Sequence, residues 1–137
     1  MRKIPIIILM VLFFTLTGCK TKEYGYYFHF SVEGGNGTIS VETSPSFNPT
    51  IKKCKDTNGM CELDCSDDSY FVRLIGKKDG KRQLTFIAIP DEGFEVSEWT
   101  FNGKVVKDNQ TNIYTAEVTS EDNYNGVIKV SFKKKQL

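Results

Sequence analysis

The sequence is poor in the residues that carry most enzyme chemistry. It has one histidine and one tryptophan in 137 residues, and it has no glycine-rich segment of the phosphate-binding type. It also lacks an excess of one charge, because 18 basic residues face 17 acidic ones. Phosphate binding needs clustered positive charge, so the composition argues against a nucleic acid partner. The expectation is a non-enzymatic protein without a cofactor or a metal.

One long hydrophobic run is present, at the start of the chain. Arg2 and Lys3 precede an apolar run of thirteen residues over 4–16. A helix of that length is too short to cross about 30 Å of hydrocarbon, and the arrangement is typical of a signal peptide over residues 1–18. The remaining 119 residues carry 16 basic and 17 acidic groups, and they are enough for one domain with a core.

The end of this run resembles the bacterial lipobox. Leu16, Thr17 and Gly18 stand directly before Cys19, as in that box. The resemblance implies recognition of these three residues by the signal peptidase, cleavage after Gly18, and a diacylglycerol on Cys19. Cysteine suits this chemistry because its thiolate is a strong nucleophile. The alternative is an ordinary signal peptide with a cysteine nearby by chance.

The lipobox resemblance also implies where the protein resides. Two or three acyl chains anchor a protein stably, whereas one does not. The expected partner of the anchor is therefore a membrane of the bacterial cell envelope, with residues 19–25 as a lipidated tether. Lys20, in place of an aspartate after the cysteine, favours the outer membrane or the cell surface over the inner membrane.

After the tether, the apolar residues recur with the period of strands. Tyr26, Phe28, Phe30 and Val32 alternate with more polar residues, a pattern typical of a half-buried strand. A turn over 34–37 and a return strand over 38–43 predict a hairpin. Further strands are expected over 70–75, 83–89, 114–118 and 128–132. We predict an all-β or nearly all-β fold: a small antiparallel sheet domain over 26–134, β-grasp-like or sandwich-like, after an N-terminal signal-peptide helix.

Local signals in the second half predict turns and one irregularity. Pro90–Gly93 has the composition of a tight turn, and Asn102–Gly103 is a strong two-residue hairpin signal. Trp99 follows Val96 by three positions rather than two, which predicts a bulge at Ser97–Glu98. Asn125–Gly126 predicts another turn. The strand at 83–89 is apolar on both faces.

The same region resembles the divergent internalin-type B-repeat of bacterial surface proteins. In that family a strand ends in Ala-x-Pro, a short turn ends in glycine, and an aromatic residue and a tryptophan follow. The matching residues are Ala88, Pro90, Gly93, Phe94 and Trp99, followed by Asn102–Gly103, a Tyr-Thr-x-x-Val-Thr strand at 114–119 and a last strand at 127–132, and preceded by Gly-Xaa-Gly-Thr-Ile at 35–39.

The B-repeat resemblance covers residues 26–43 and 70–134, in a single copy rather than a tandem array. It implies a binding or adhesion module for a protein or glycan ligand, and it carries over no catalytic residues. The remaining segment, 44–69, is then an insertion, and we expect it to be the contact surface because binding residues gather on loops. The alternative function is a periplasm-facing structural or accessory subunit of an envelope complex.

The insertion holds three cysteines. A turn at Asp56–Gly59 would place Cys54 opposite Cys61, which favours a disulfide between these two and leaves Cys65 as a free thiol. All three could instead stay reduced. A zinc site of the three cysteines with His29 is disfavoured, because their spacing matches no common structural zinc pattern.

His29 and the charged loops are expected to be solvated. His29 lies on the strand face opposite Phe28 and Phe30, so an exposed histidine is expected rather than a catalytic base. The acidic residues of the insertion do not have the spacing of a calcium loop. A basic turn near residues 77–82 is interpreted as a solvated tip.

Overall fold

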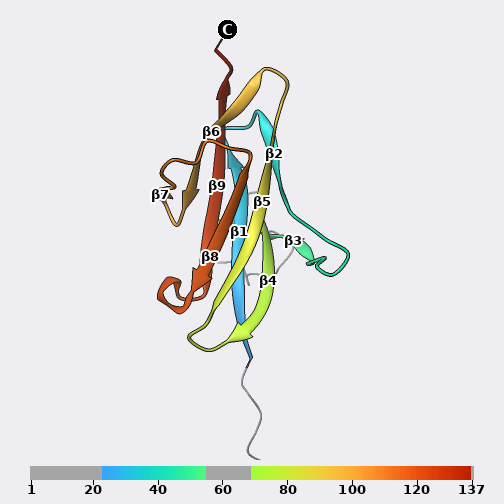
Figure 1. Ribbon diagram of the computed structural model, residues 1–137, viewed down its shortest axis with the longest axis vertical. Coiled ribbons are helices and arrows are strands. Elements are labelled where there is room, and N and C mark those ends of the chain that lie inside the picture. The colour runs from blue at the N-terminus through green and yellow to red at the C-terminus, as the bar shows by residue number, and fades with distance from the viewer. Residues whose placement is uncertain (1–22, 55–68, 137) are drawn as a thin grey trace, which may run out of the picture.

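Alternating apolar residues form nine strands in residues 23–54 and 69–136, the part of the chain that the computed structural model describes (Figure 1). One turn of 3-10 helix, η2 (Ser120–Asp122), connects the last two strands. The strands are β1 (Glu23–Glu33), β2 (Gly37–Val41), β3 (Ile51–Lys53), β4 (Tyr70–Lys77), β5 (Lys81–Pro90), β6 (Phe94–Phe101), β7 (Lys104–Val105), β8 (Ile113–Thr119) and β9 (Asn125–Lys134).

The strands form two sheets. Sheet A has the order β3-β4-β1-β9-β6-β7, and sheet B has the order β2-β5-β8. Every strand pair is antiparallel except β1 with β9, which run parallel in the middle of sheet A. The all-β prediction is confirmed, as a small two-sheet domain in which sheet A is mixed.

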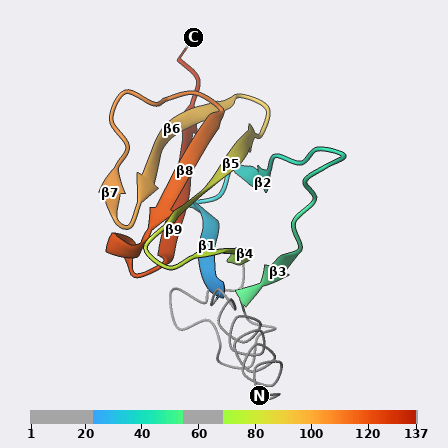
Figure 2. The same cartoon turned by 60° about the horizontal axis from the view of Figure 1, so that its bottom comes forward.

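The two sheets pack face to face and share one core (Figures 1 and 2). The longer strands contribute alternate residues, as strands packed on one face require, apart from the bulge in β6, whereas the short strands β3 and β7 contribute none. The largest side chains that are fully buried are Trp99, Tyr26, Phe28 and Phe86. The predicted inward faces at 114–118 and 128–132 are confirmed, with Ala116, Val118, Ile128 and Val130 fully buried.

Three local signals of the second half predicted real features. Asn102 and Gly103 form the two-residue turn between β6 and β7, and both have the positive φ that such a turn needs, 50° and 82°. The Pro90–Gly93 turn is closed by a hydrogen bond from the Phe94 N–H to the Asp91 carbonyl, at 3.0 Å. The register of β6 against β9 shifts between Val96 and Glu98, which confirms the bulge.

The predicted hairpin over 26–43 is wrong. The turn is present, but β1 and β2 belong to different sheets. β1 is paired along both edges, with β4 on one side and β9 on the other. Because no edge of β1 remains, the chain crosses to sheet B, where β2 pairs with β5.

Asn125–Gly126 is also not a turn. Both residues lie in β9, opposite Tyr27 and Phe28, and the chain reverses earlier, at Asn123 and Tyr124, whose φ angles are positive. Glycine is needed at 126 for a different reason. A Cβ there would lie 2.6 Å from a Val118 methyl and 2.8 Å from the Phe101 ring. The residue permits close packing rather than a turn.

The sandwich has two distinct ends (Figure 1). The proximal end holds the start of β1 at Glu23, the turn between β4 and β5, and η2. The distal end holds the turns at 34–36 and 91–93 and the end of β9. Tyr26 joins two proximal elements, because its hydroxyl donates to the Lys77 carbonyl. Within the described residues, no helix has the length and apolar character needed to cross a bilayer.

Candidate functional site

The residues predicted from the sequence as sites fall partly outside the described structure. The lipobox residues Leu16, Thr17, Gly18 and Cys19, with Cys61 and Cys65 of the insertion, all lie there. The Cys54–Cys61 disulfide and the Cys65 thiol therefore stay predictions. The B-repeat motif is described: Ala88 and Trp99 are buried, whereas Pro90, Gly93 and Phe94 surround the turn between β5 and β6.

Cys54 and His29 lie together on the outer face of sheet A. Cys54 is 2% exposed and packs in a small cluster with Phe71 and Tyr27. The His29 ring packs against both of these rings, with centroid distances of 6.3 Å to Tyr27 and 6.0 Å to Phe71, which are themselves 6.3 Å apart. Its Nε2 is 3.5 Å from Oδ1 of Asn125.

The expectation of an exposed His29 is therefore wrong, because the side chain is only 5% exposed. It does point away from Phe28 and Phe30, as the alternation predicted. The error arose because the outer face of sheet A carries its own aromatic cluster. Among the described residues, no group of histidine, cysteine and carboxylate side chains is placed to hold a metal ion.

The base of the insertion lies beside this cluster. The Cys54 N–H donates to the Ser69 carbonyl at 3.0 Å, which ties the two ends of segment 55–68 together. Ser69 is also buried, at 3% exposure. The two residues that flank segment 55–68 are thus held together beside β3 and β4.

A different surface, on the outer face of sheet B, carries exposed apolar side chains. Ile89 is 52% exposed and Ile113 is 57% exposed. Ile87 lies directly opposite Ile113 across the β5–β8 pair and is half-buried. We name these three residues the isoleucine patch. It lies in the distal half of the sandwich, since Ile89 comes just before the turn at 91–93.

Hydroxyl groups border the isoleucine patch. Thr38 is opposite Ile89, and Ser40 is opposite Ile87. On the proximal side, the hydroxyls of Thr85 and Thr115 are hydrogen-bonded at 2.8 Å. A shallow hollow of ≈ 370 Å³ continues from these two threonines toward Phe47 and Leu84. The patch and the hollow form a continuous surface of apolar carbon and hydroxyls, with the Glu42 carboxylate and the Gln83 amide at the wall of the hollow.

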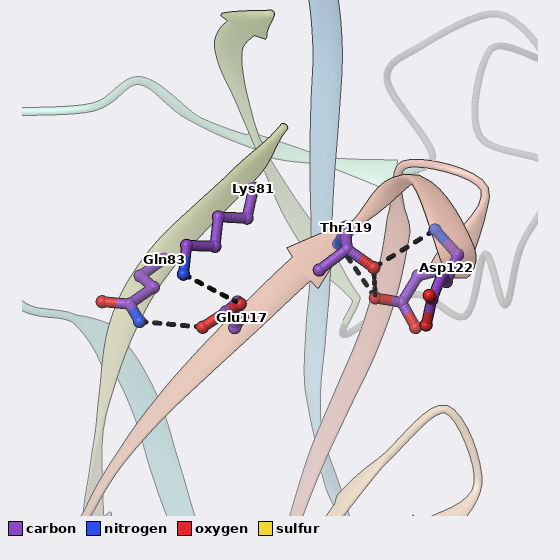
Figure 3. A network of polar contacts seen from close by, with 6 residues as sticks. Lys81, Gln83, Glu117, Thr119 and Asp122 are labelled. Carbon is purple, nitrogen blue, oxygen red and sulfur yellow. Dashed lines mark hydrogen bonds and ion pairs between the residues drawn. The ribbon is translucent and has the colours of Figure 1, made fainter. Parts of the chain in front are cut away.

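The same face becomes charged toward the proximal end (Figure 3). Glu117 accepts a hydrogen bond from the Gln83 amide at 3.0 Å and lies 4.0 Å from the Lys81 ammonium. Both partners of the ion pair are well exposed, so it adds little stability. The outer face of sheet B thus changes from isoleucine through threonine to charged residues along its length.

Tyr114, on the core-facing side of β8, has a hydroxyl with a shifted pKa. Burial raises the pKa of its hydroxyl above the ordinary value of 10.0, and the negative charge of Asp122 raises it further. The unfolded chain then loses this proton at a lower pH than the folded one. Stability should therefore fall as the pH rises above about 10.

We expect Tyr114→Phe to reduce this alkaline loss of stability, because phenylalanine has no proton to lose. Denaturant unfolding of the wild type and the variant, measured from pH 8 to pH 11, checks the prediction. Equal slopes of stability against pH in the two proteins would contradict it.

The sequence contained one signal for the isoleucine patch, the apolar residues on both faces of 83–89. That signal could not show which face would stay exposed, because this depends on which sheet packs on which face. Comparison of the chain with protein-family models, with curated proteins and with solved structures found no match.

Proposed function

We propose that this chain is a lipid-anchored protein of the bacterial cell envelope whose β-sandwich is a non-enzymatic binding module for another protein. The observation that carries the proposal is the isoleucine patch, at the end of the fold away from the lipobox cysteine. The likeness to the B-repeat supports the same reading, because Ala88 and Trp99 lie in the core that such a module needs.

The position of Cys19 relative to β1 supports an orientation. Only residues 20–22 separate Cys19 from Glu23, where β1 begins. At 3.8 Å per Cα step, the lipidated cysteine would lie at most about 15 Å from the proximal end. The proximal end then faces the bilayer and the isoleucine patch points away from it, toward partners.

The chemistry of the patch favours a protein partner over a carbohydrate one. Exposed isoleucine side chains gain free energy when they are covered by apolar atoms, at about 25 cal/mol for each Å² removed from water. Ile89 and Ile113 are each more than half exposed, and the neutral hydroxyls around them leave no charge to desolvate. An apolar surface with a polar border is typical of protein contact sites.

Replacing two patch residues should abolish partner capture without unfolding the domain. We expect the double variant Ile89→Lys, Ile113→Lys to lose the proteins that the wild-type chain retains by crosslinking in an envelope fraction. Val105→Lys is the matched control, because Val105 is 54% exposed but lies on β7 of sheet A. Equal capture by all three proteins would refute the patch as the binding surface.

Accessibility to protease separates surface display from the alternative, a periplasm-facing subunit of an envelope complex. We expect protease added to intact cells to cleave the chain if it is displayed on the surface. Protection until the outer membrane is opened would instead support the periplasmic alternative. Deletion of 55–68 in the same capture experiment tests whether the insertion also contributes.

A further inference from the structure

One edge of sheet B is left open by the hydrogen-bond register of β2. The Asp91 N–H donates to the Asn36 carbonyl at 3.0 Å, and the Glu42 N–H donates to the Thr85 carbonyl at 2.9 Å. Bonded positions alternate along an antiparallel pair, so the even-numbered residues of β2 direct their backbone groups toward β5. The odd-numbered residues Gly37, Ile39 and Val41 direct theirs to the opposite side.

No described strand lies on that opposite side. Within residues 23–54 and 69–136, β2 pairs with β5 alone, and no other backbone hydrogen bond reaches Gly37, Ile39 or Val41. The N–H and C=O groups of these three residues therefore have no backbone partner among the described residues, with Gly37 and Ile39 half-buried and Val41 6% exposed. β2 reads Gly-Thr-Ile-Ser-Val, with no proline and no charge. Such an edge is a template for another strand.

The opposite edge of the same sheet, on β8, is closed at both ends. The Ile113 carbonyl accepts from the side chains of Asn109 and Thr111, at 3.1 and 2.9 Å. At the other end, the Thr119 N–H donates to the Asp122 carboxylate at 2.9 Å (Figure 3), and its carbonyl accepts from the Tyr124 N–H at 3.2 Å. Side chains and η2 thus occupy positions that an added strand would need.

The two edge strands of sheet A are protected from pairing with another chain because they are short and carry lysine. β3 has three residues, two of which are Lys52 and Lys53. β7 has only two, one of which is Lys104. Short strands and lysine at an edge both discourage pairing with another chain. Among the described strands, β2 is the edge that carries none of these protections.

We propose that the β2 edge binds an extended peptide segment of the partner protein by strand addition. The partner's backbone would pair with Gly37, Ile39 and Val41. Its outward side chains would lie beside Thr38 and Ser40 and extend the surface of the isoleucine patch, so apolar or β-branched residues at alternate positions fit best. This inference deepens the proposed binding function and rests on it.

A second copy of this chain fits the edge less well once it is anchored. Antiparallel pairing about Ile39 would match Gly37 with Val41 in register, but it reverses the long axis of the second copy. Two proteins lipidated at Cys19 would then carry their anchors at opposite ends and could not share one membrane. If the two edges paired in parallel instead, the second copy would be flipped over. Its core-facing side would then continue the outer face of the first copy. A segment of a different protein has neither restriction.

A synthetic peptide with the sequence of residues 35–43 provides the probe, since an unanchored peptide can pair antiparallel in the register just described. We expect it to shift the amide NMR signals of Gly37, Ile39 and Val41 in the full chain in detergent micelles. The same three amides should become protected from hydrogen exchange. A peptide N-methylated at the residues corresponding to 37, 39 and 41 keeps its side chains but cannot pair, and it should not bind.

Two proline variants test the edge from the protein side. Ile39→Pro removes an N–H that makes no internal bond, so the fold should persist and the peptide should bind at least about tenfold more weakly. Glu117→Pro is the matched control, because register places its N–H on the free side of β8 and it lies at the charged end, away from the isoleucine patch. It should leave binding unchanged. Binding of the N-methylated peptide, or signal changes confined to β8, would overturn the proposal.

The capture experiment distinguishes failure of the strand-addition proposal from failure of the proposed binding function on which it rests. If Ile39→Pro loses the envelope partner as the isoleucine double variant does, the edge is part of the contact. If Ile39→Pro retains the partner while the double variant loses it, the strand-addition proposal fails and the binding function stands. The full chain could instead prove to be a dimer in micelles, with the Ile39→Pro variant a monomer. That result would show that the occupant of the edge is a second copy and would overturn the choice of partner.

Discussion

Replacing Trp99 by alanine should lower the free energy of unfolding by about 3–5 kcal/mol. Trp99 is fully buried between the sheets, and its indole N–H donates to the Thr111 carbonyl at 2.9 Å. Its ring also packs against Tyr114, with centroids 5.5 Å apart. The variant leaves a large cavity and loses the hydrogen bond to the Thr111 carbonyl. Because a domain of this size has only about 5–15 kcal/mol of stability, the loss is a large part of the total.

Urea unfolding followed by circular dichroism measures this effect. Trp99→Phe should lose less, because it keeps an aromatic ring in the core while removing the hydrogen bond to Thr111. Val105→Ala is the surface control and should change stability by no more than about 0.5 kcal/mol. A Trp99→Ala protein as stable as this control would show that the core is not packed as described.

Replacing Cys19 by serine should abolish acylation of the chain. The lipid is expected on the Cys19 thiol, and a serine hydroxyl is a far weaker nucleophile than a thiolate. In cells fed an alkyne-tagged fatty acid, label on the wild-type protein should fall to background in Cys19→Ser. Mass spectrometry of the wild type should show a chain that begins at Cys19 and carries the acyl mass.

Cys54→Ser is the internal control for this experiment, because Cys54 lies in the fold, 2% exposed, far along the chain from the lipobox. It should retain full label. Label that persists in Cys19→Ser, or that disappears in Cys54→Ser, would contradict the lipobox assignment. The same spectra of the wild type would report whether Cys54 and Cys61 are joined.

The features that could be predicted from the sequence depend on local chemistry. Asn102–Gly103 needs positive φ at two successive residues, and few other dipeptides adopt that geometry as easily. The bulge before Trp99 was visible because a single extra residue breaks a period of two. The alternation in β8 and β9 likewise follows from each strand's own contact with the core.

The features that could not be predicted depend on which strands meet. The turn after Glu33 was recognisable, but nothing nearby showed that β9, about a hundred residues later, would take the edge of β1 that β2 was expected to fill. His29 was misjudged for a related reason, since its neighbour Phe71 comes from β4. The open edge of β2 has the same origin, because it exists only once β2 has been placed at the side of sheet B.

The parallel pairing of β1 with β9 sets the order in which the domain can be completed. Tyr27–Glu33 pairs with Asn125–Ser131 in the centre of sheet A. The first strand of the fold therefore cannot complete its pairing until the last strand is present. Contacts this distant in sequence form slowly, because a long loop must close before they can stabilise anything. Sheet A therefore cannot be completed until residues 125–131 have been synthesised, so shorter nascent chains lack the central strand pair of the fold.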